Sequence, residues 1–503
     1  MTSHLRTGEP PVIRVAIDPR MAGEYGPEVH WVLRLWLTTA GWAWREVAFG
    51  DPADIVYSAD LAQDHPARLV IRAMPDRWAR RKALSLTRAH GWPDLPRLAY
   101  AGEPEAGPAV PRDGRLLCPQ DLVFDTFFVA TGQMESRMPQ DKHGFHDLGA
   151  FPEYRRAVLD EGVVSAIAAW VEKTLLDLGG PPPQPRWPDG RRAALALGHD
   201  VDYPEVIRWL EPARVLLRQG PRGLPLAAQV LLGQRHHWHF ADWMQVEQAL
   251  GARSAFYFVA RQGSLVEYAA GTPDSFYDVG APSFRRLFQT LREAGFEVGL
   301  HASYRAYASR EQFETEKARL EAASGGPVIG NRHHYWHMDP ADPEATLKLH
   351  EAIGLHYDSS VNHNRYLGWR RGVAHPYFPF LPADRREIGT LQAPVTWMDD
   401  QLFAMRADNP GDPWARLQAA VDRAAALGGC FIVDIHDYVF DAALFPGWSD
   451  LYRRLVGEVG RRGDFWLATP AEVAAHWRAR HAQLLSRSAG LGLGLALPHP
   501  SPA

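Results

Sequence analysis

Apolar runs of strand length alternate with helix-type patterns over most of the chain after residue 192. Segments such as "SFRRLFQTLREAG" (283–295) and "SREQFETEKARLEAA" (309–323) have a helical pattern and separate several of these runs. This alternation predicts a mostly parallel sheet with right-handed crossovers, either open or closed into a barrel. The expected strands are "AALAL" (193–197), "SAFYFVA" (254–260), "FEVGLH" (296–301), "VIGNRHHY" (328–335), "HYDSSV" (356–361), "REIGTLQAP" (386–394), "CFIVDIH" (430–436) and "DFWLAT" (464–469).

The first part of the chain shows a smaller set of the same elements. "VIRVAI" (12–17) and "ARLVIRAM" (67–74) favour strands, and "VVSAIAAWVEKTLLDL" (163–178) favours a helix. The proline-rich segment "LGGPPPQPRWPDGRR" (178–192) cannot continue a helix or a central strand. We therefore expect an α/β accessory domain at 1–178, a linker at 179–191, a second domain at 192–480 and a disordered tail at 481–503.

Composition narrows the class of protein. The 503 residues are 46% hydrophobic and 22% charged, as in a globular protein, and a net charge of −5 with no basic tract argues against a nucleic-acid partner. No segment approaches the roughly 20 apolar residues that span a bilayer, and the first residues lack the apolar stretch of a signal peptide. The two cysteines, Cys118 and Cys430, have no ligand-type spacing. We expect a cytoplasmic protein of unknown oligomeric state.

Reactive side chains lie at or just after the ends of five expected strands. Asp200 and Asp202 share one face of their strand end, because side chains two residues apart point the same way. In a barrel, the carboxyl ends of the strands form one face, where active sites are built. One carboxylate and two imidazoles can bind a zinc-like cation and leave a position for water. The other side chains are His301, then Arg332, His333 and His334, then Asp358, and finally His436.

Several motifs, in order, resemble the polysaccharide deacetylases of carbohydrate esterase family 4. They are "GHDVDY" (198–203), "GLHASY" (299–304), "NRHHYW" (331–336), "YDSSV" (357–361), "GWRRGVAHPYFPF" (368–380) and "APVTWMDD" (393–400). The resemblance covers about residues 192–470, and "DTFFVATGQMESRMPQDKHGF" (125–145) looks like the accessory domain that often precedes this branch. It implies a distorted (β/α) barrel that follows a smaller α/β domain, and a metal-dependent deacetylase.

For the metal, the resemblance implies Asp202 and His301 as ligands. The family usually has a second histidine four residues after the first, where this chain has Arg305, which cannot release its proton to bind a metal. The proline of the family's R-x-P-Y motif is replaced here by His334. We infer that the third ligand has moved to that loop, so that the set is Asp202, His301 and His334. The expected cation is Zn²⁺.

For catalysis, the resemblance implies Asp200 as the base that takes a proton from water. Arg332 would orient this base, and the backbone N–H of Tyr335 would help to form the oxyanion hole. His436 would protonate the leaving amine. Each of these groups answers a need of amide hydrolysis, because the nucleophile must lose a proton and the amine must gain one.

Three more residues are candidates for substrate binding: Asp358, Arg370 and Asp399. Either Asp358 or Asp399 could orient His436. Arg370 lies in the glycine-bounded loop "GWRRG" and could contact a sugar or an anionic group, although a solvated arginine fits this loop equally well. The three histidines of "HHWHF" (236–240) are expected in a loop that enters a helix.

Three functions fit these observations. The first is a metal-dependent hydrolase of C–N bonds that removes acetyl from an amino-sugar-containing carbohydrate, such as a nucleotide- or lipid-linked precursor. The second keeps the site but acts on small cyclic amides or imides; a cavity closed by the accessory domain would favour it, whereas an open groove would favour glycans. The third is a carbohydrate-binding protein without turnover, for which the missing second histidine argues. Carbohydrate or another acetylated small molecule is the expected partner.

Overall fold

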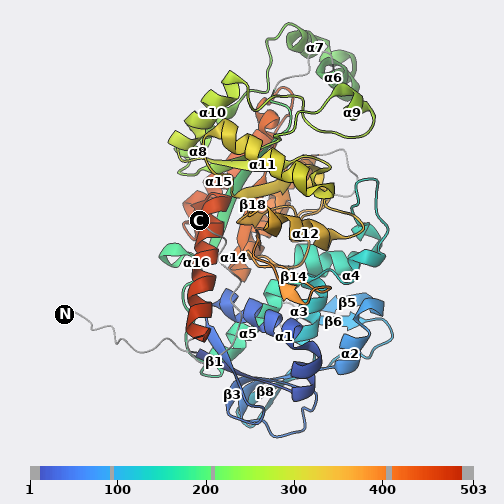
Figure 1. The fold of residues 1–503 in the computed structure, drawn as a ribbon, viewed down its shortest axis with the longest axis vertical. Helices are drawn as coiled ribbons and strands as arrows, with labels where there is room; N and C mark the ends of the chain where they lie inside the picture. The colour runs from blue at the N-terminus through green and yellow to red at the C-terminus, as the bar shows by residue number, and fades with distance from the viewer. Residues whose placement is uncertain (1–11, 91–95, 205–209, 404–410, 490–503) are drawn as a thin grey trace, which may run out of the picture.

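Two sheets organise the chain in the computed structural model, which describes residues 12–90, 96–204, 210–403 and 411–489. The first sheet has six strands in the order β2-β1-β3-β4-β8-β7 and lies within the part of the chain expected to form the accessory domain, a name kept below for residues 12–178. The second has nine strands and begins after the proline-rich segment. Figure 1 shows the accessory domain at one end of the molecule and the second sheet with its helices above it.

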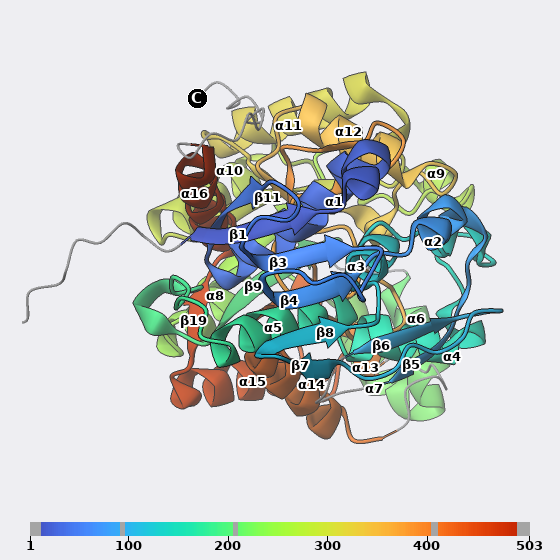
Figure 2. The ribbon, with the colours of Figure 1, turned by 90° about the horizontal axis from the view of Figure 1, so that it is seen from below.

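Three helices of the accessory domain lie on the face of its sheet that looks toward the second domain (Figure 2). They are α1 (Pro19–Ala40), α3 (Leu122–Ala130) and α5 (Val163–Asp177). Their apolar side chains form one core with the buried strands, as expected of an α/β layer. The strands are β1 (Val12–Ile17), β2 (Ala43–Val47), β3 (Ala53–Ser58), β4 (Ala67–Arg72), β7 (Val110–Arg112) and β8 (Arg115–Cys118), beside a separate pair, β5 (Leu86–His90) and β6 (Arg97–Tyr100).

The second sheet is parallel throughout and follows the path β16-β13-β12-β11-β10-β9-β18-β17, with β19 also paired to β9. Its ends, β16 and β17, are not paired with each other in the described residues, so the sheet is a half-barrel. The expected α/β architecture is confirmed. The strands are β9 (Ala193–Val201), β10 (Ser254–Phe258), β11 (Glu297–Ala302), β12 (Gly330–His333), β13 (Tyr357–Asp358), β16 (Leu391–Gln392), β17 (Trp397–Met398), β18 (Cys430–Asp434) and β19 (Phe465–Ala468).

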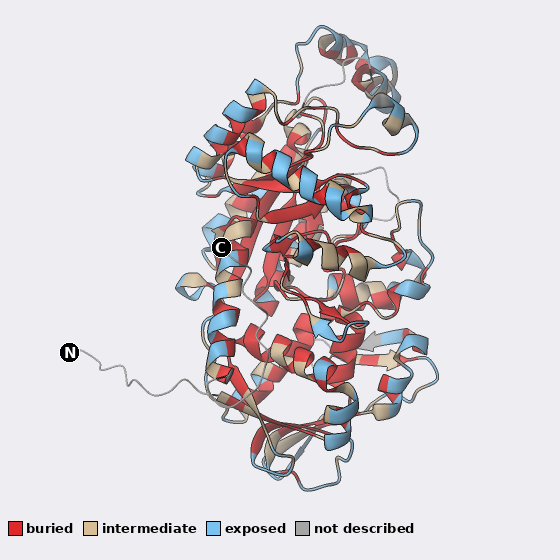
Figure 3. Ribbon diagram, viewed as in Figure 1, coloured by how far each residue is buried: buried red, intermediate tan, exposed pale blue. Residues whose placement is uncertain are grey.

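Helices with buried inner faces and exposed outer faces cover the second sheet (Figure 3). None of the described helices is both long and apolar enough to cross a membrane. The longer ones are α8 (Phe240–Ala249), α10 (Pro282–Glu293), α11 (Arg310–Ser324), α12 (Pro343–Ala352), α14 (Pro413–Leu427), α15 (Trp448–Arg462) and α16 (Pro470–Ala489). The shorter helices after residue 192 are α6 (Glu211–Gln219), α7 (Leu224–Leu231), α9 (Leu265–Ala269) and α13 (Asp400–Phe403), and those before it are α2 (Pro75–Ala79) and α4 (Pro152–Arg155).

Two expected segments differ in the structure. The run 386–394 is divided, because β15 (Arg386–Glu387) pairs antiparallel with β14 (Phe380–Leu381) while β16 lies at the edge of the large sheet. Helix α16 runs to Ala489, so residues 481–489, expected in a disordered tail, are helical; residues 490–503 lie outside the described residues. The apolar side chains of Leu484 and Leu485 are buried, which explains why the helix continues.

The two domains share part of their cores. Tyr366, Val373, Tyr377 and Phe380 come from the second domain but pack in the core of the accessory domain. The Trp31 indole on α1 donates a hydrogen bond to the Phe378 carbonyl at 2.9 Å. Burial of these apolar groups between the domains holds the accessory domain against the second sheet.

Candidate metal centre and active site

The parallel strands bring four of the expected side chains to one point at the carboxyl end of the second sheet. Asp202 follows β9, His301 lies on β11, His334 follows β12, and His436 follows β18. Asp202 Oδ1 is 3.3 Å from His301 Nε2 and 3.5 Å from His334 Nε2, and its Oδ2 is 3.6 Å from His436 Nε2. The ends of β9, β11, β12 and β18 thus bring together side chains that are far apart in the sequence.

Asp202, His301 and His334 fit a divalent cation. A tetrahedral zinc site with bonds of 2.0–2.1 Å places its ligand atoms roughly 3.3 Å apart, close to the distances between these three side chains. All three are buried, and their ligand atoms lie within 4.8 Å of one another. Asp202 Oδ1 and His334 Nε2 are buried without a hydrogen-bond partner, which is costly unless something else binds them. This chemistry is that of a three-ligand site with a position left for water or substrate.

The far nitrogens of both histidines are held so that Nε2 faces the centre. His301 Nδ1 donates to the Arg332 carbonyl at 2.7 Å. His334 Nδ1 lies 3.4 Å from Asp274 Oδ1, and the Tyr304 backbone N–H also donates to this oxygen, at 2.7 Å. Such outer partners fix the tautomer and orientation of metal-binding histidines. The sequence analysis missed Asp274, which lies in an irregular loop and follows no strand.

Electrostatic interactions within the cluster also fit a cation site. Burial opposes ionisation of Asp202, yet the neighbouring His334, His301 and His436 hold its pKa well below the ordinary value. Burial lowers the pKa of His334, but Asp202 and Asp274 outweigh it and raise that pKa to about 10. A divalent cation at this point would balance the charge of these carboxylates.

Asp200 and Arg332 form a buried ion pair next to the metal ligands. Arg332 Nη1 donates to Asp200 Oδ1 at 2.8 Å and to Asp434 Oδ1 at 2.9 Å, and the guanidinium carbon lies 4.2 Å from the centre of the Tyr257 ring. Asp200 Oδ2 remains 3.6 Å from His301 Nε2, so this oxygen faces the cation site. The ion pair holds the Asp200 carboxylate in this orientation.

Asp434 is a second residue that the sequence analysis missed. It lies at the end of β18, fully buried, two residues before His436. Burial and the nearby Asp200 raise its pKa well above the ordinary value, although Arg332 opposes this. Its position in "VDIH" repeats the spacing of Asp200 and Asp202, and that repeat is the signal that could have revealed it.

His436 is held by Asp399. His436 Nδ1 lies 3.0 and 3.1 Å from the two Asp399 oxygens, and the His436 backbone N–H donates to Oδ2 at 2.7 Å. Burial lowers the pKa of His436, but Asp399 and then Asp202 raise it well above the ordinary value. The structure therefore places a cationic imidazole beside the cluster and selects Asp399, of the two candidates, as its partner.

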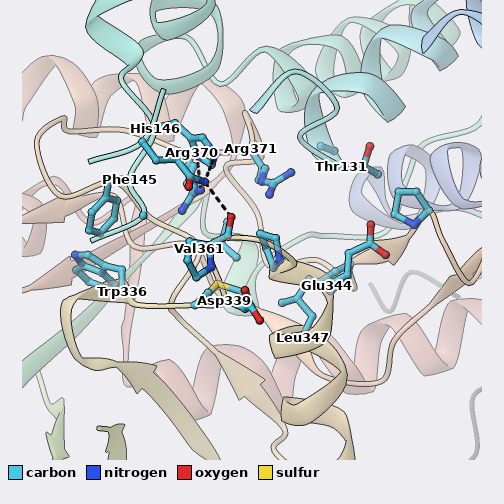
Figure 4. A pocket seen from close by; sticks show the side chains of 18 of the residues that line it. Thr131, Phe145, His146, Trp336, Asp339, Glu344, Leu347, Val361, Arg370 and Arg371 are labelled. Atoms are coloured by element: carbon cyan, nitrogen blue, oxygen red, sulfur yellow. Dashed lines mark hydrogen bonds between the residues drawn. The ribbon is translucent and has the colours of Figure 1, made fainter. Parts of the chain in front are cut away.

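Two of the substrate-binding candidates lie away from this cluster. Asp358 is fully buried beneath it and accepts hydrogen bonds from Asn331 Nδ2 and Ser360 Oγ, each at 2.7 Å. Arg370 lines a different pocket between the two domains, together with Arg371 and His146 (Figure 4). Both arginines also pair with the Glu135 carboxylate. Neither location could be read from the motifs, because a loop pattern does not show which way a side chain points.

The cavity over the cluster has a volume of about 240 Å³ and aromatic walls. Tyr203, Tyr335, Tyr438 and Trp448 line it together with the charged residues. Tyr335 has φ of 57° and is 40% exposed, so it stands at the rim in the left-handed region that bulky residues rarely adopt. Aromatic rings around a few convergent polar groups are typical of a small-molecule site.

Comparison with known proteins finds relatives only among solved structures, since no family model and no curated sequence matches the chain. A Pseudomonas aeruginosa polysaccharide deacetylase is 17% identical with a TM-score of 0.40, over 60% of this chain and 96% of that one. A Mycobacterium smegmatis polysaccharide deacetylase is 18% identical with a TM-score of 0.38, over 58% and 93%. Polysaccharide deacetylases are thus the structures that it resembles. Puue allantoinase is 17% identical with a TM-score of 0.39, over 60% and 95%.

Because these TM-scores are low, the function is inferred from the geometry of the site and not from the similar structures. The residue at the position of the usual second histidine in polysaccharide deacetylases, Arg305, is exposed to solvent beyond β11. His333, the neighbour of His334, points away from the centre and places its Nε2 2.9 Å from His350 Nε2. The histidines of 236–240 lie before helix α8 as expected, with His237 Nδ1 bonded to the Tyr203 carbonyl at 2.9 Å.

Proposed function

We propose that this protein is a metal-dependent hydrolase of non-peptide amide bonds that removes the acetyl group from an amino-sugar substrate. One observation carries the proposal. Asp202 Oδ1 and His334 Nε2 are buried without a hydrogen-bond partner, and Asp202 Oδ1 lies 3.3 Å from His301 Nε2 and 3.5 Å from His334 Nε2, beside the Asp200–Arg332 ion pair. A cation site next to an ionised carboxylate is what hydrolysis of an unreactive amide needs. Zn²⁺ fits the one-carboxylate, two-imidazole donor set.

Asp202, His301 and His334 would hold the cation, which when bound lowers the pKa of water and polarises a carbonyl group. Asp200 would take the proton of the attacking water through Oδ2, the oxygen that faces the cation site. Arg332 fixes the orientation of this carboxylate through Oδ1. Asp200 would therefore act as the base, and Arg332 would hold it in position.

On the other side of Asp202, the cationic His436 imidazole can donate a proton to the departing amine through Nε2. Asp399 holds the ring from Nδ1 and stabilises its positive charge. The Tyr335 backbone N–H would stabilise negative charge that develops on the acetyl oxygen, a contribution of about 3 kcal/mol for a donor of this kind.

Metal analysis and acetate release from acetylated amino sugars test this proposal together. We expect about one divalent cation per chain in the wild type, metal retained but turnover reduced by about 10²–10⁴-fold in Asp200→Ala, and weak metal binding in His334→Ala. Arg305→Ala is the control, because this exposed side chain is expected to affect neither readout. Wild-type protein that binds no cation would contradict the proposal.

A second candidate function is hydrolysis of small cyclic amides or imides at the same site. It is favoured by the approach of the accessory domain to the rim of the cavity. His143 of that domain lies 2.8 Å from the Tyr304 hydroxyl through Nδ1, and its ring centre is 5.1 Å from that of Tyr335. A metal-loaded protein that opens hydantoin or dihydrouracil but releases no acetate would select this candidate. Metal without either activity would favour a carbohydrate-binding role.

A further inference from the structure

An exposed apolar surface lies on the hairpin formed by α6 and α7, residues 211–232, together with the neighbouring α9. The hairpin projects at the end of the molecule opposite the accessory domain (Figure 1). Among the described residues, eight large hydrophobic side chains are exposed, and five of them are here: Leu217, Leu224, Leu231, Leu232 and Val266. Soluble surfaces scatter such side chains singly, so their concentration on one projection indicates a partner.

Helix α7, "LPLAAQVL", is apolar on all sides and has Gln229 as its one polar side chain. Its inner face packs against the second domain through the buried Ala227 and Val230. Its outer face carries Leu224, Ala228 and Leu231 at helical spacing, and the two leucines are 58% and 56% exposed. A helix that is apolar all round is expected to be covered on both faces. None of the described residues covers this outer face.

The charges on the hairpin decide what kind of surface would cover it. Residues 212–234 contain Arg214, Arg218 and Arg222 and no acidic residue. Glu211, just before them, is buried and pairs with Arg214 and Arg218, which leaves the hairpin with a net positive charge. Exposed leucines flanked by arginines match the boundary of an anionic lipid bilayer. A second copy of the chain would bring Arg222 toward its own counterpart, which charge repulsion opposes.

The hairpin also stands beside the active-site cavity. The Arg214 guanidinium carbon lies 6.0 Å from the ring centre of Tyr203, which lines the cavity. The corresponding carbon of Arg218 lies 5.3 Å from the ring centre of Phe445, and that ring is 5.5 Å from the ring of Trp448, another lining residue. A surface that bound the hairpin would therefore lie near the cavity.

We propose that the α6–α7 hairpin docks the protein peripherally on an anionic phospholipid bilayer, with its exposed leucines in the headgroup boundary and Arg222 near the lipid charges. Docking does not depend on the proposed hydrolase function. It places the cavity where a substrate attached to a lipid would be presented.

Sedimentation with vesicles tests this docking. We expect the full-length protein to bind vesicles of phosphatidylcholine with phosphatidylserine, and to bind vesicles of phosphatidylcholine alone much more weakly. The double change Leu224→Gln and Leu231→Gln should reduce binding about tenfold or more, because two leucines no longer enter the bilayer. Arg222→Glu should reduce it about fivefold or more and should leave the fold intact. Leu176→Gln, on the accessory domain, is the matched control and should bind like the wild type.

Two results would overturn the docking proposal. One is equal binding, or no binding, by wild type and variants on phosphatidylserine vesicles at low salt. The other is a dimer of the wild type, seen by light scattering, that the double leucine change dissociates; that result would assign the surface to a second copy. Neither result affects metal content or acetate release, so failure of docking and failure of the hydrolase proposal are distinguishable.

Discussion

At the scale of single residues, the proposed metal centre differs from the family pattern in the position of one ligand. His334, which follows β12, would supply the third ligand, whereas the position four residues after His301 carries the exposed Arg305. Asp274 makes this arrangement workable, because it orients His334 from the far nitrogen. Arg261 Nη1, 3.0 Å from Asp274 Oδ2, in turn fixes that carboxylate. The ligand and its support thus come from segments 60 residues apart.

We expect Asp274→Asn to weaken metal binding by about 10- to 100-fold while Asp202, His301 and His334 remain in place. The loss arises because an amide neither attracts the Nδ1 proton as strongly nor increases the basicity of Nε2. Competition titration with a chelating dye measures the affinity. Arg305→Ala serves again as the control, and an unchanged affinity in Asp274→Asn would show that the contact does not support the ligand.

A buried carboxyl of the accessory domain should make stability depend on pH. Burial raises the pKa of Asp125 to about 7, despite the opposing charge of Arg77. The pKa of an unfolded aspartate is about 3.9. The stabilisation from this group is therefore fully present below about pH 4 and is lost as pH rises through about 7, a change of roughly 4 kcal/mol.

We expect the free energy of unfolding to fall between pH 4 and 8 in the wild type, and to fall less in Asp125→Asn, which cannot ionise. Urea unfolding at a series of pH values measures the difference. Asp60→Asn, at an exposed loop of the same domain, is the control. Parallel pH curves for wild type and Asp125→Asn would contradict the assignment.

At the scale of elements, the last part of β9 leaves space for Arg332, the residue that positions the proposed base. A Cβ atom on Gly198 would lie 3.0 Å from Arg332 Nη2 and 3.1 Å from the Tyr257 ring. Arg332 cannot move aside freely, because Asp200 and Asp434 hold its Nη1 and the Tyr257 ring lies against its plane. The absence of a side chain at Gly198 in "GHDVDY" therefore leaves room for Arg332, which positions the proposed base Asp200.

We expect Gly198→Ala to lower kcat by about tenfold, because a displacement of a few tenths of an ångström lengthens the Asp200–Arg332 contact. Metal content should stay the same, since no ligand contacts Gly198. Acetate release and metal analysis on the same sample give both values. Loss of bound metal together with activity would indicate instead that the whole strand end has shifted.

The sequence predicted these elements well where a run of apolar residues lies in the middle of the sheet. Strands β9, β10 and β18 are buried along their length and β11 is buried after its first residue, so hydrophobic pattern and structure agree. Asp274 escaped prediction because its loop has no periodic pattern. The location of Arg370 was not predicted, because the direction of the "GWRRG" loop depends on Glu135 in the other domain. No local sequence pattern shows this contact.

At the scale of the whole molecule, helix α16 ties the two domains together. Arg480 on this helix is buried and donates hydrogen bonds to the carbonyls of Thr38, Thr39 and Pro185. Arg478, two residues earlier, donates instead to carbonyls of the second domain, those of His356 and Gly389. Replacing Arg480 therefore removes contacts between the domains, whereas replacing Arg478 removes contacts within the second domain.

We expect Arg480→Ala to lower the free energy of unfolding by about 2 kcal/mol or more, since several buried carbonyls lose their donor. It should also separate the unfolding of the two domains in calorimetry. Arg478→Ala should lower stability while the domains still unfold together. A single transition of equal shape in both variants would show that α16 does not couple them.

The same helix constrains the order of events during synthesis. Its Ser488 hydroxyl accepts a hydrogen bond from the backbone N–H of Trp44, so strand β2, near the start of the chain, meets a partner made more than 400 residues later. The accessory domain is synthesised before α16, so this contact with its outer strand forms only after the second domain has been made. Its exposed edge is therefore the part of the nascent chain that a chaperone would need to shield.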